Sequence, residues 1–390
     1  MQFAKRTEGI DSSFIREILK LTQNQEVISF AGGLPSSELF PTEEFELAAR
    51  KILSDKSSAQ KALQYGESAG LKSLIDVIVK SYKVKDNLDV DPNLVLITNG
   101  SQQALDLISK IYISSEDYIA VESPTYLAAL QSFAFYSKNF LPLELAHDGP
   151  NTENLEKIKK AKLLYSIVNF QNPSGITWSN EKREEIANFC KKHNILLIED
   201  DPYGEIRFEG ERPKPLKTFS DNVVMLGSFS KTLAPGLRLG WIIAPNKDFF
   251  EKLILAKQAA DLHSSQFTQM IAAEFYKDFD AQAHIEKIAR LYGKQKDIMQ
   301  NALNDFLPNA HFESPQGGMF LWIKFPEHVD SKELLKLAVK EGVAFVPGEA
   351  FFAEENAPKN FARLNFTNAS EKEIVEGVRR LKEAYDKYHL

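Results

Sequence analysis

Cysteine is nearly absent from this sequence, because Cys190 is the only one among 390 residues. A single cysteine excludes an intrachain disulfide framework and a clustered thiolate metal site, and it is typical of a reducing compartment. We expect Cys190 to be a buried, inert thiol on a helix over residues 180–193. The seven histidines lack H-E-x-x-H spacing, so we predict no metal site.

Long hydrophobic runs and an excess of positive charge are also missing. No run approaches the roughly 18 apolar residues of a membrane-spanning helix, and acidic residues interrupt the opening segment where a signal peptide needs an apolar core. The 47 lysines and arginines are outnumbered by 54 acidic residues, giving a net charge of −7. Such a charge does not attract polyanions. We therefore predict a cytoplasmic protein that binds neither membranes nor nucleic acid.

The glycine motifs of nucleotide-binding proteins are the third absence, since neither G-x-G-x-x-G nor a P-loop occurs. This argues against a nicotinamide oxidoreductase. Apolar runs instead alternate with helical patterns over residues 102–112, 126–136 and 180–193. Such alternation is typical of a mainly parallel sheet covered on both faces, and it predicts a large α/β domain. The apolar runs are VLITNG, DYIAVES, LLYSIVNF, ILLIED, VVMLG and LGWIIA.

The pattern changes after about residue 281. A long helix is expected over 285–306 and a shorter one over 332–340, with the strands MFLWIKF, VAFVP and ARLNF and a terminal helix around them. Strands and helices without regular crossovers favour a smaller α+β domain. We expect an N-terminal segment, 1–45, that packs with the small domain, a large domain over 46–280, and the small domain over 281–390.

Polar residues follow four of the predicted strands. Ligands bind beyond the carboxyl ends of the strands in open α/β sheets, so we expect these residues to meet at one crevice. They are Gly100, Ser101 and Gln102 after VLIT; Asn172, Pro173 and Gly175 after LLYSIV; Asp200 and Tyr203 after LLIE; and Ser228, Ser230 and Lys231 after VVML.

Three of these residues allow both a functional and a structural interpretation. Ser101 opens a helix whose N-terminus suits a phosphate, or it simply caps that helix. A buried Asp200 needs a cationic partner such as a protonated ring nitrogen, unless Asp200 or Asp201 caps a turn. Lys231 can form a Schiff base if it is desolvated, whereas most lysines are solvated surface residues.

Three segments together resemble a known family: QNPSG, EDDPYGEIRF and SFSKTLAPGLRLGW. The chain is similar to fold-type I pyridoxal-phosphate (PLP) enzymes of the class I/II aminotransferase group. The subgroup it most resembles contains 2-aminoadipate and kynurenine aminotransferases and the effector domain of MocR-type regulators. The resemblance runs from FAGGLP (30–35) to ARLNF (362–366). It implies a large domain with a mainly parallel, seven-stranded sheet and a smaller α+β domain.

The resemblance implies roles for the residues around the cofactor ring. Lys231 matches the lysine that carries PLP as an aldimine and then shuttles a proton. Asp200 matches the carboxylate that keeps the pyridine nitrogen protonated, so that the ring accepts electrons. Tyr203 and Asn172 match the pair that hydrogen-bonds the phenolic oxygen of the ring, and Tyr126 matches the aromatic residue that stacks on it.

The resemblance also implies the phosphate ligands, which are Ser101, Gln102, Ser228 and Arg238. A helix N-terminus and one guanidinium suit a dianion. Tyr65 matches a residue that the neighbouring subunit donates to the phosphate, which implies a homodimer.

The substrate residues that the resemblance implies are Arg363, Asn172 and Gly33. Arg363 matches the arginine that binds the substrate α-carboxylate, with help from Asn172. Gly33 matches a point of close backbone approach to the substrate. Arg16 could bind the distal carboxylate of an acidic donor, or it could be an exposed helix charge.

The implied activity is a ping-pong transfer of an amino group. The donor is an aromatic, 2-aminoadipate-like or branched L-amino acid, and the acceptor is a 2-oxoacid such as 2-oxoglutarate. The alternatives are another PLP reaction, such as β-elimination or decarboxylation, and a MocR-like ligand-sensing domain. We expect the regulator less, because the chain begins almost at FAGGLP and leaves no room for a winged helix.

Overall fold

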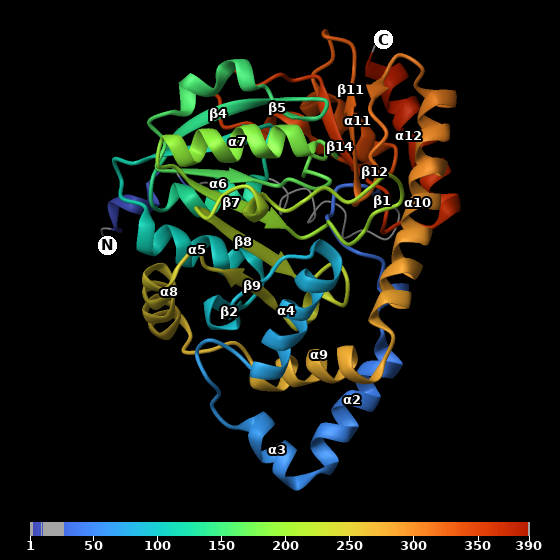
Figure 1. The fold of residues 1–390 in the computed structure, drawn as a ribbon. Helices are drawn as coiled ribbons and strands as arrows, with labels where there is room; N and C mark the ends of the chain where they lie inside the picture. Colours follow the sequence, from blue (N-terminus) through green and yellow to red (C-terminus); the bar gives the residue numbers. More distant parts are fainter. Residues whose placement is uncertain (1–2, 9, 11–26, 389–390) are drawn as a thin grey trace.

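A large sheet of eight strands forms the centre of the fold in the computed structural model, which describes residues 3–8, 10 and 27–388 (Figure 1). From β8 to β4 each strand runs parallel to its neighbour, whereas β9 is antiparallel to both β2 and β8. The predicted mainly parallel sheet is confirmed, and the two-residue strand β5 extends its edge. The strands, in spatial order, are β2 (Val95–Thr98), β9 (Gly240–Ile243), β8 (Val223–Ser228), β7 (Leu196–Asp201), β6 (Leu163–Ser166), β3 (Tyr118–Ser123), β4 (Asn139–Ala146) and β5 (Gly149–Pro150).

Helices cover both faces of this sheet because both faces of its strands are apolar. In β7, Leu196 and Ile198 pack in the core on one face, and Leu197 packs in the core on the other. Successive side chains of a strand point to opposite faces, so a continuous apolar run needs two covering layers. One layer consists of α5 (Ser101–Tyr112), α6 (Leu127–Ala134) and α8 (Lys247–Ala260); the other consists of α4 (Lys72–Asp86), α7 (Asn180–Lys192) and α9 (Gln266–Asp278).

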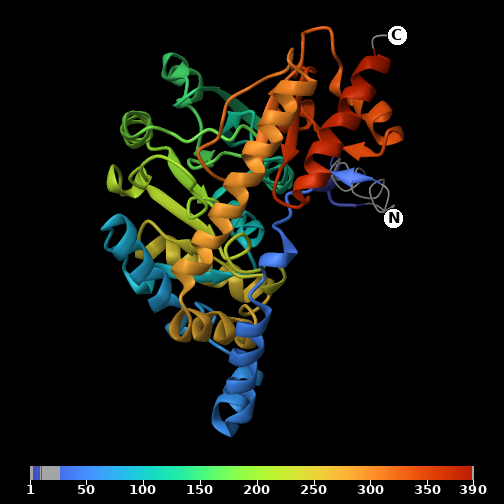
Figure 2. The ribbon, with the colours of Figure 1, turned by 90° about the vertical axis from the view of Figure 1, so that its right-hand side faces the viewer.

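A four-stranded antiparallel sheet belongs to the C-terminal part of the chain. Figure 2 shows this part of the chain in orange and red. There β1 (Ile28–Ser29) pairs with β12 (Val343–Ala344), and the Asn365 amide donates to the Phe30 carbonyl over 2.8 Å. The boundaries that divide the chain into domains stay a prediction. The elements of this part are β10 (His311–Phe312), β11 (Phe320–Lys324), β14 (Phe361–Asn365), β13 (Val346–Pro347), α10 (Ala281–Phe306), α11 (Ser331–Lys340) and α12 (Glu371–Tyr388).

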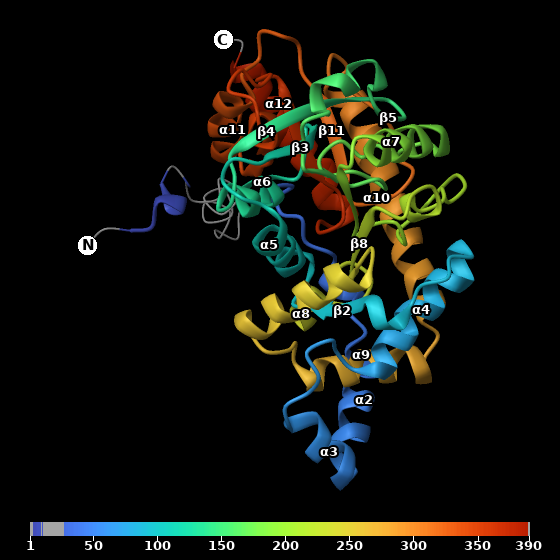
Figure 3. The same ribbon diagram turned by 60° about the vertical axis from the view of Figure 1, so that its left-hand side comes forward.

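Two helices, α2 (Thr42–Ser54) and α3 (Lys56–Leu63), project away from the large sheet (Figures 1 and 3). They pack on α9 through a small apolar cluster of Ala48, Ile52, Ala62 and Ile271. Within the described part of the chain, no helix is long and apolar enough to cross a membrane.

Candidate active site

A cavity of about 290 Å³ lies where β2, β6, β7 and β8 end, and β11 and β14 also contribute to its wall. It collects the predicted site residues from segments far apart in the sequence. Tyr65 does not line the cavity of its own chain, and its side chain is 79% exposed to solvent. Arg16 lies outside the described residues. The predicted residues that line the cavity are Gly33, Gly100, Ser101, Gln102, Tyr126, Asn172, Asp200, Tyr203, Ser228, Ser230, Lys231, Arg238 and Arg363, whereas Pro173 and Gly175 do not line it.

Lys231 follows β8 and points its amine into the site. Its Nζ donates to the Gly33 carbonyl over 2.7 Å. Burial lowers the pKa of this amine to about 8, with help from the positive charges of Arg363 and Arg238. A lysine whose pKa is lowered in this way has a larger neutral fraction than a solvated lysine, and the neutral amine is the nucleophilic form. The interpretation of Lys231 as a solvated surface residue is therefore wrong.

Asp200, at the end of β7, is 2% exposed. Its Oδ2 accepts a hydrogen bond from the Tyr165 hydroxyl over 2.8 Å, while its buried Oδ1 has no partner. Burial raises the pKa of this carboxyl to about 7. The turn is capped by Asp201, which accepts from the Gly204 amide over 2.8 Å. Asp200 is thus left to bind a donor from the cavity.

Ser101 is the first residue of α5, and its buried hydroxyl makes no hydrogen bond. The helix is preceded by Gly100, at φ +77°, and has no side-chain cap. The interpretation of Ser101 as a simple cap is therefore wrong. Unpaired backbone N–H groups and a free hydroxyl at a helix N-terminus form an anion site.

Arg238 lies directly over this helix end. Its Nη2 donates to the Asn99 carbonyl over 3.1 Å, and a Cβ on Gly100 would come within 2.8 Å of the same nitrogen. Glycine is therefore needed at position 100 both for its φ angle and for the approach of the guanidinium. Ser228 lies close in the same wall, where its Oγ accepts from the Ser230 amide over 3.1 Å.

Arg363, in the middle of β14, is 2% exposed. It donates to Asn172 Oδ1 over 2.8 Å and to the Ala31 carbonyl over 2.7 Å, and its Nε has no partner. Among the described residues, no carboxylate oxygen lies within 4 Å of its guanidinium nitrogens. A buried guanidinium without a carboxylate fits an anionic ligand that binds through two oxygens.

The aromatic residues of the cavity shape the space between these charges. Asn172 Nδ2 lies 3.5 Å from the Tyr203 hydroxyl, and Tyr203 meets the Phe320 ring edge-on at 5.9 Å. The Arg363 guanidinium lies 4.2 Å from the centre of the Phe320 ring. Burial raises the pKa of both Tyr203 and Tyr126, so each keeps its hydroxyl proton at neutral pH.

Residues 27–381 match the sequence pattern of the family described as aminotransferase class I and II. The chain belongs to this family. It is 42% identical to aromatic-amino-acid aminotransferase 1 of Thermococcus litoralis, across 98% of this chain and 93% of that protein. This degree of identity along the whole chain makes it an aminotransferase.

Solved structures of aminotransferases agree with this chain in fold and length. The kynurenine aminotransferase of Pyrococcus horikoshii is 37% identical, with a TM-score of 0.93 over 99% of this chain and 97% of that chain. The α-aminoadipate aminotransferase of Thermus thermophilus, solved with N-(5'-phosphopyridoxyl)-L-leucine, is 35% identical, with a TM-score of 0.90 over 99% of this chain and 97% of that chain.

The cofactor of this aminotransferase is PLP, and the cavity fits each part of that molecule. Lys231 supplies an amine for the aldehyde, and Asp200 has a free carboxylate oxygen for a protonated ring nitrogen. The N-terminus of α5 and Arg238 suit the phosphate.

Sequence reasoning missed several residues that surround the cavity. Tyr165 holds Asp200 from inside the sheet, and Phe320 lies beneath Arg363. Tyr165 stands within an apolar strand, where a buried hydroxyl needs a partner, and this was its only sequence signal. The other lining residues that were not predicted are Gly32, Ile167, Pro202 and Pro235.

Proposed function

We propose that this aminotransferase moves the amino group of an aromatic or 2-aminoadipate-like L-amino acid to 2-oxoglutarate. The proposal depends on one observation: the same cavity contains the Lys231 amine, with its lowered pKa, and the buried Arg363 guanidinium. This guanidinium has no carboxylate partner among the described residues. The arginine would bind the α-carboxylate of the donor. The lysine would then take the proton from Cα and deliver it to C4′ of the cofactor, which leaves the donor carbon at the level of an oxoacid.

Residues around the ring and phosphate have separate tasks in this proposal. When bound, PLP supplies an electron sink for the bond that breaks at Cα. Asp200 would keep the ring nitrogen protonated, Tyr203 with Asn172 would hold the phenolic oxygen, and Tyr126 would lie against the ring. The phosphate ligands are Ser101, Gln102, Ser228 and Arg238, and Gly33 gives the donor room next to the backbone.

The lining of the cavity favours an aromatic donor. Leu34, Ile167 and Phe320 offer apolar contacts, and every cation in the described lining already has a role in the proposal: Lys231 and Arg363 as above, and Arg238 with the phosphate. Aromatic, kynurenine and α-aminoadipate aminotransferases are among the relatives named above. A distal carboxylate needs one more cation, and we assign this task to Arg16. A branched donor would use the same apolar contacts.

We further propose a cytoplasmic homodimer in which Tyr65 reaches the phosphate of the partner. Tyr65 is exposed, and so are the apolar side chains of Leu47, Leu53 and Leu63 on the projecting helices α2 and α3. Grouped apolar side chains on a projection are typical of an interface between subunits.

A donor panel tests the proposal. Purified protein with PLP is incubated with 2-oxoglutarate and phenylalanine, tyrosine, leucine or 2-aminoadipate, and the glutamate formed is measured. We expect glutamate from the aromatic donors and from 2-aminoadipate, and Arg16→Ala should lower the rate for 2-aminoadipate alone. An absence of glutamate with every donor would contradict amino transfer. Release of ammonia or carbon dioxide without an oxoacid would indicate elimination or decarboxylation.

A further inference from the structure

Residues 167–178, here called the Asn172 loop, connect the end of β6 to the start of α7 and carry Asn172 into the cavity. Asn172 is the only described residue whose side chain forms hydrogen bonds with both Tyr203 and Arg363. The backbone of this loop is not relaxed, because the non-glycine residue Phe170 has φ +49°. A strained backbone persists only where its surroundings hold it in place.

Glu122 holds the loop from the side of the sheet. This side chain, on β3, is 0% exposed. Its carboxyl oxygens accept from the Ile167 amide over 3.1 Å, from Gln171 Nε2 over 3.1 Å and from Trp178 Nε1 over 3.0 Å. These donors lie at the beginning, middle and end of the Asn172 loop. Among the described residues, Glu122 forms no ion pair with a lysine or arginine, so these hydrogen bonds are what offsets its burial.

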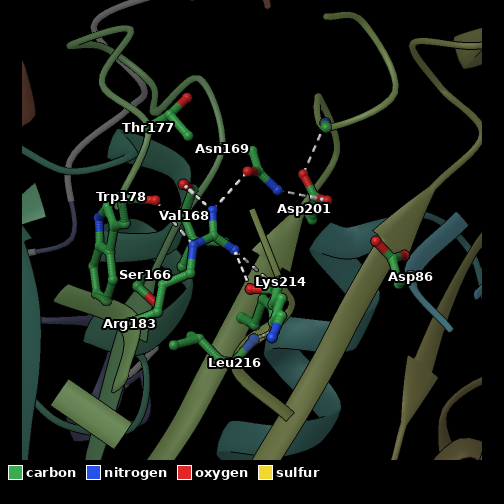
Figure 4. A network of polar contacts seen from close by, with 12 residues as sticks. Asp86, Ser166, Val168, Asn169, Thr177, Trp178, Arg183, Asp201, Lys214 and Leu216 are labelled. Atoms are coloured by element: carbon green, nitrogen blue, oxygen red, sulfur yellow. Dashed lines mark hydrogen bonds and ion pairs between the residues drawn. The ribbon is translucent and has the colours of Figure 1, made fainter. Parts of the chain in front are cut away.

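Arg183 holds the same loop from the side of α7, as Figure 4 shows. Its guanidinium is also 0% exposed. It donates to the Val168 carbonyl over 2.9 Å, to Asn169 Oδ1 over 2.7 Å and to the Trp178 carbonyl over 3.0 Å. Asn169 then donates to Asp201 Oδ2 over 2.9 Å, which ties the loop to the residue after Asp200.

We propose that Glu122 and Arg183 are positioning residues for amino transfer: one accepts and the other donates, and together they fix the Asn172 loop so that Asn172 meets Tyr203 and Arg363. Neither side chain lines the cavity, so each acts only through the loop. A fixed Asn172 orients the Arg363 guanidinium, and a preorganised guanidinium binds a carboxylate more tightly than a mobile one. The inference rests on the role proposed above for Arg363.

Two substitutions that preserve size test the pair in the PLP-loaded enzyme. Glu122→Gln replaces one acceptor oxygen by an NH2 group, which opposes the N–H groups that point at it. Arg183→Lys keeps the charge but cannot reach the acceptors on Val168, Asn169 and Trp178 together. Cys190→Ala, on the same helix as Arg183, is the control, because Cys190 is buried and contacts none of these groups.

The readout is the dissociation constant of 3-phenylpropionate, an aromatic carboxylate without an amino group, followed through the visible spectrum of the cofactor. We expect both variants to raise it about five- to tenfold, the loss that one misplaced charge-assisted hydrogen bond brings. Cys190→Ala should lower the melting temperature and leave this constant unchanged. Adding Glu122→Gln to Asn172→Ala should cause no further loss, because both changes remove the same contact.

Three results would count against these claims, and they are distinguishable. If Glu122→Gln and Arg183→Lys lower the melting temperature but leave the dissociation constant unchanged, both residues are merely structural and the inference is wrong. The same holds if the losses of Glu122→Gln and Asn172→Ala add. If Arg363→Lys itself leaves the constant unchanged, the carboxylate site is elsewhere and the proposed function is wrong.

Discussion

Replacing Asp200 by asparagine should stabilise the protein without cofactor and destabilise it with cofactor. The substitution keeps the shape of the side chain and an oxygen for the Tyr165 hydroxyl, and it removes the charge. Without PLP, the ionised carboxylate is 2% exposed and leaves Oδ1 without a partner. With PLP, a protonated ring nitrogen supplies that partner, and the charge becomes favourable.

The size of the effect follows from the pKa of Asp200, which burial raises from 3.8 to about 7 in the folded protein. An acid whose pKa is higher in the folded state makes its full contribution to stability below its unfolded pKa, and this contribution is lost as the pH rises through the folded pKa. The cofactor-free wild type should therefore lose stability between about pH 4 and about pH 7, by ~1.4 kcal/mol per pH unit and ~4 kcal/mol at most. The Asp200→Asn variant should not lose stability in this way, because asparagine has no carboxyl group to ionise.

The assay is urea unfolding of both proteins between pH 5 and pH 8, with and without PLP. Without PLP, we expect the free energy of unfolding of Asp200→Asn, measured relative to that of the wild type, to increase as the pH rises. This difference should become constant above about pH 7. With PLP, the order should reverse. Asp221→Asn, which removes an exposed carboxylate, is the control. A difference that is equal at pH 5 and pH 8, or equal stabilisation of both proteins by PLP, would refute the reasoning.

Further substitutions test the other parts of the site. Arg363→Lys should raise KM for the donor at least about tenfold in steady-state kinetics, because a bidentate charge-assisted contact is lost. Gly100→Ala should weaken PLP binding to the apoprotein about tenfold in a fluorescence titration, because its Cβ would come within 2.8 Å of Arg238 Nη2. Tyr65→Phe should also weaken PLP binding, while the melting temperature of the apoprotein stays unchanged, because Tyr65 is exposed within its own chain. Unchanged KM for the first, or unchanged PLP affinity for the other two, would contradict the assigned roles.

Much of the fold was predictable because its central strands are short, apolar and bounded by turn residues. The apolar run ILLIED became β7 (Leu196–Asp201), and VVMLG became β8 (Val223–Ser228). The predicted helix over 285–306 begins earlier, at Ala281, because Asp280 caps it by accepting from the Ala283 amide. Strand β4 (Asn139–Ala146) was missed, since Pro142 and Glu144 interrupt its apolar pattern and it lies near the sheet edge.

The site was predictable where a polar residue follows a strand, as Ser101, Asp200 and Lys231 do. Such residues gather at one edge of the sheet whatever the details of packing. The contacts that hold them were not predictable. Glu122 and Arg183 stand in a strand and a helix like any other charged residue, and only the folded chain shows that both reach the Asn172 loop. Likewise, the sequence does not indicate which of Asp200 and Asp201 caps the turn.

The most direct test of the account is to locate the covalent cofactor. The holoenzyme is reduced with borohydride and digested, and the labelled peptide is identified by mass spectrometry. The account predicts a phosphopyridoxyl group on Lys231 and none in the Lys231→Ala variant. A label on another lysine, or a label that persists in Lys231→Ala, would contradict the central role given to Lys231.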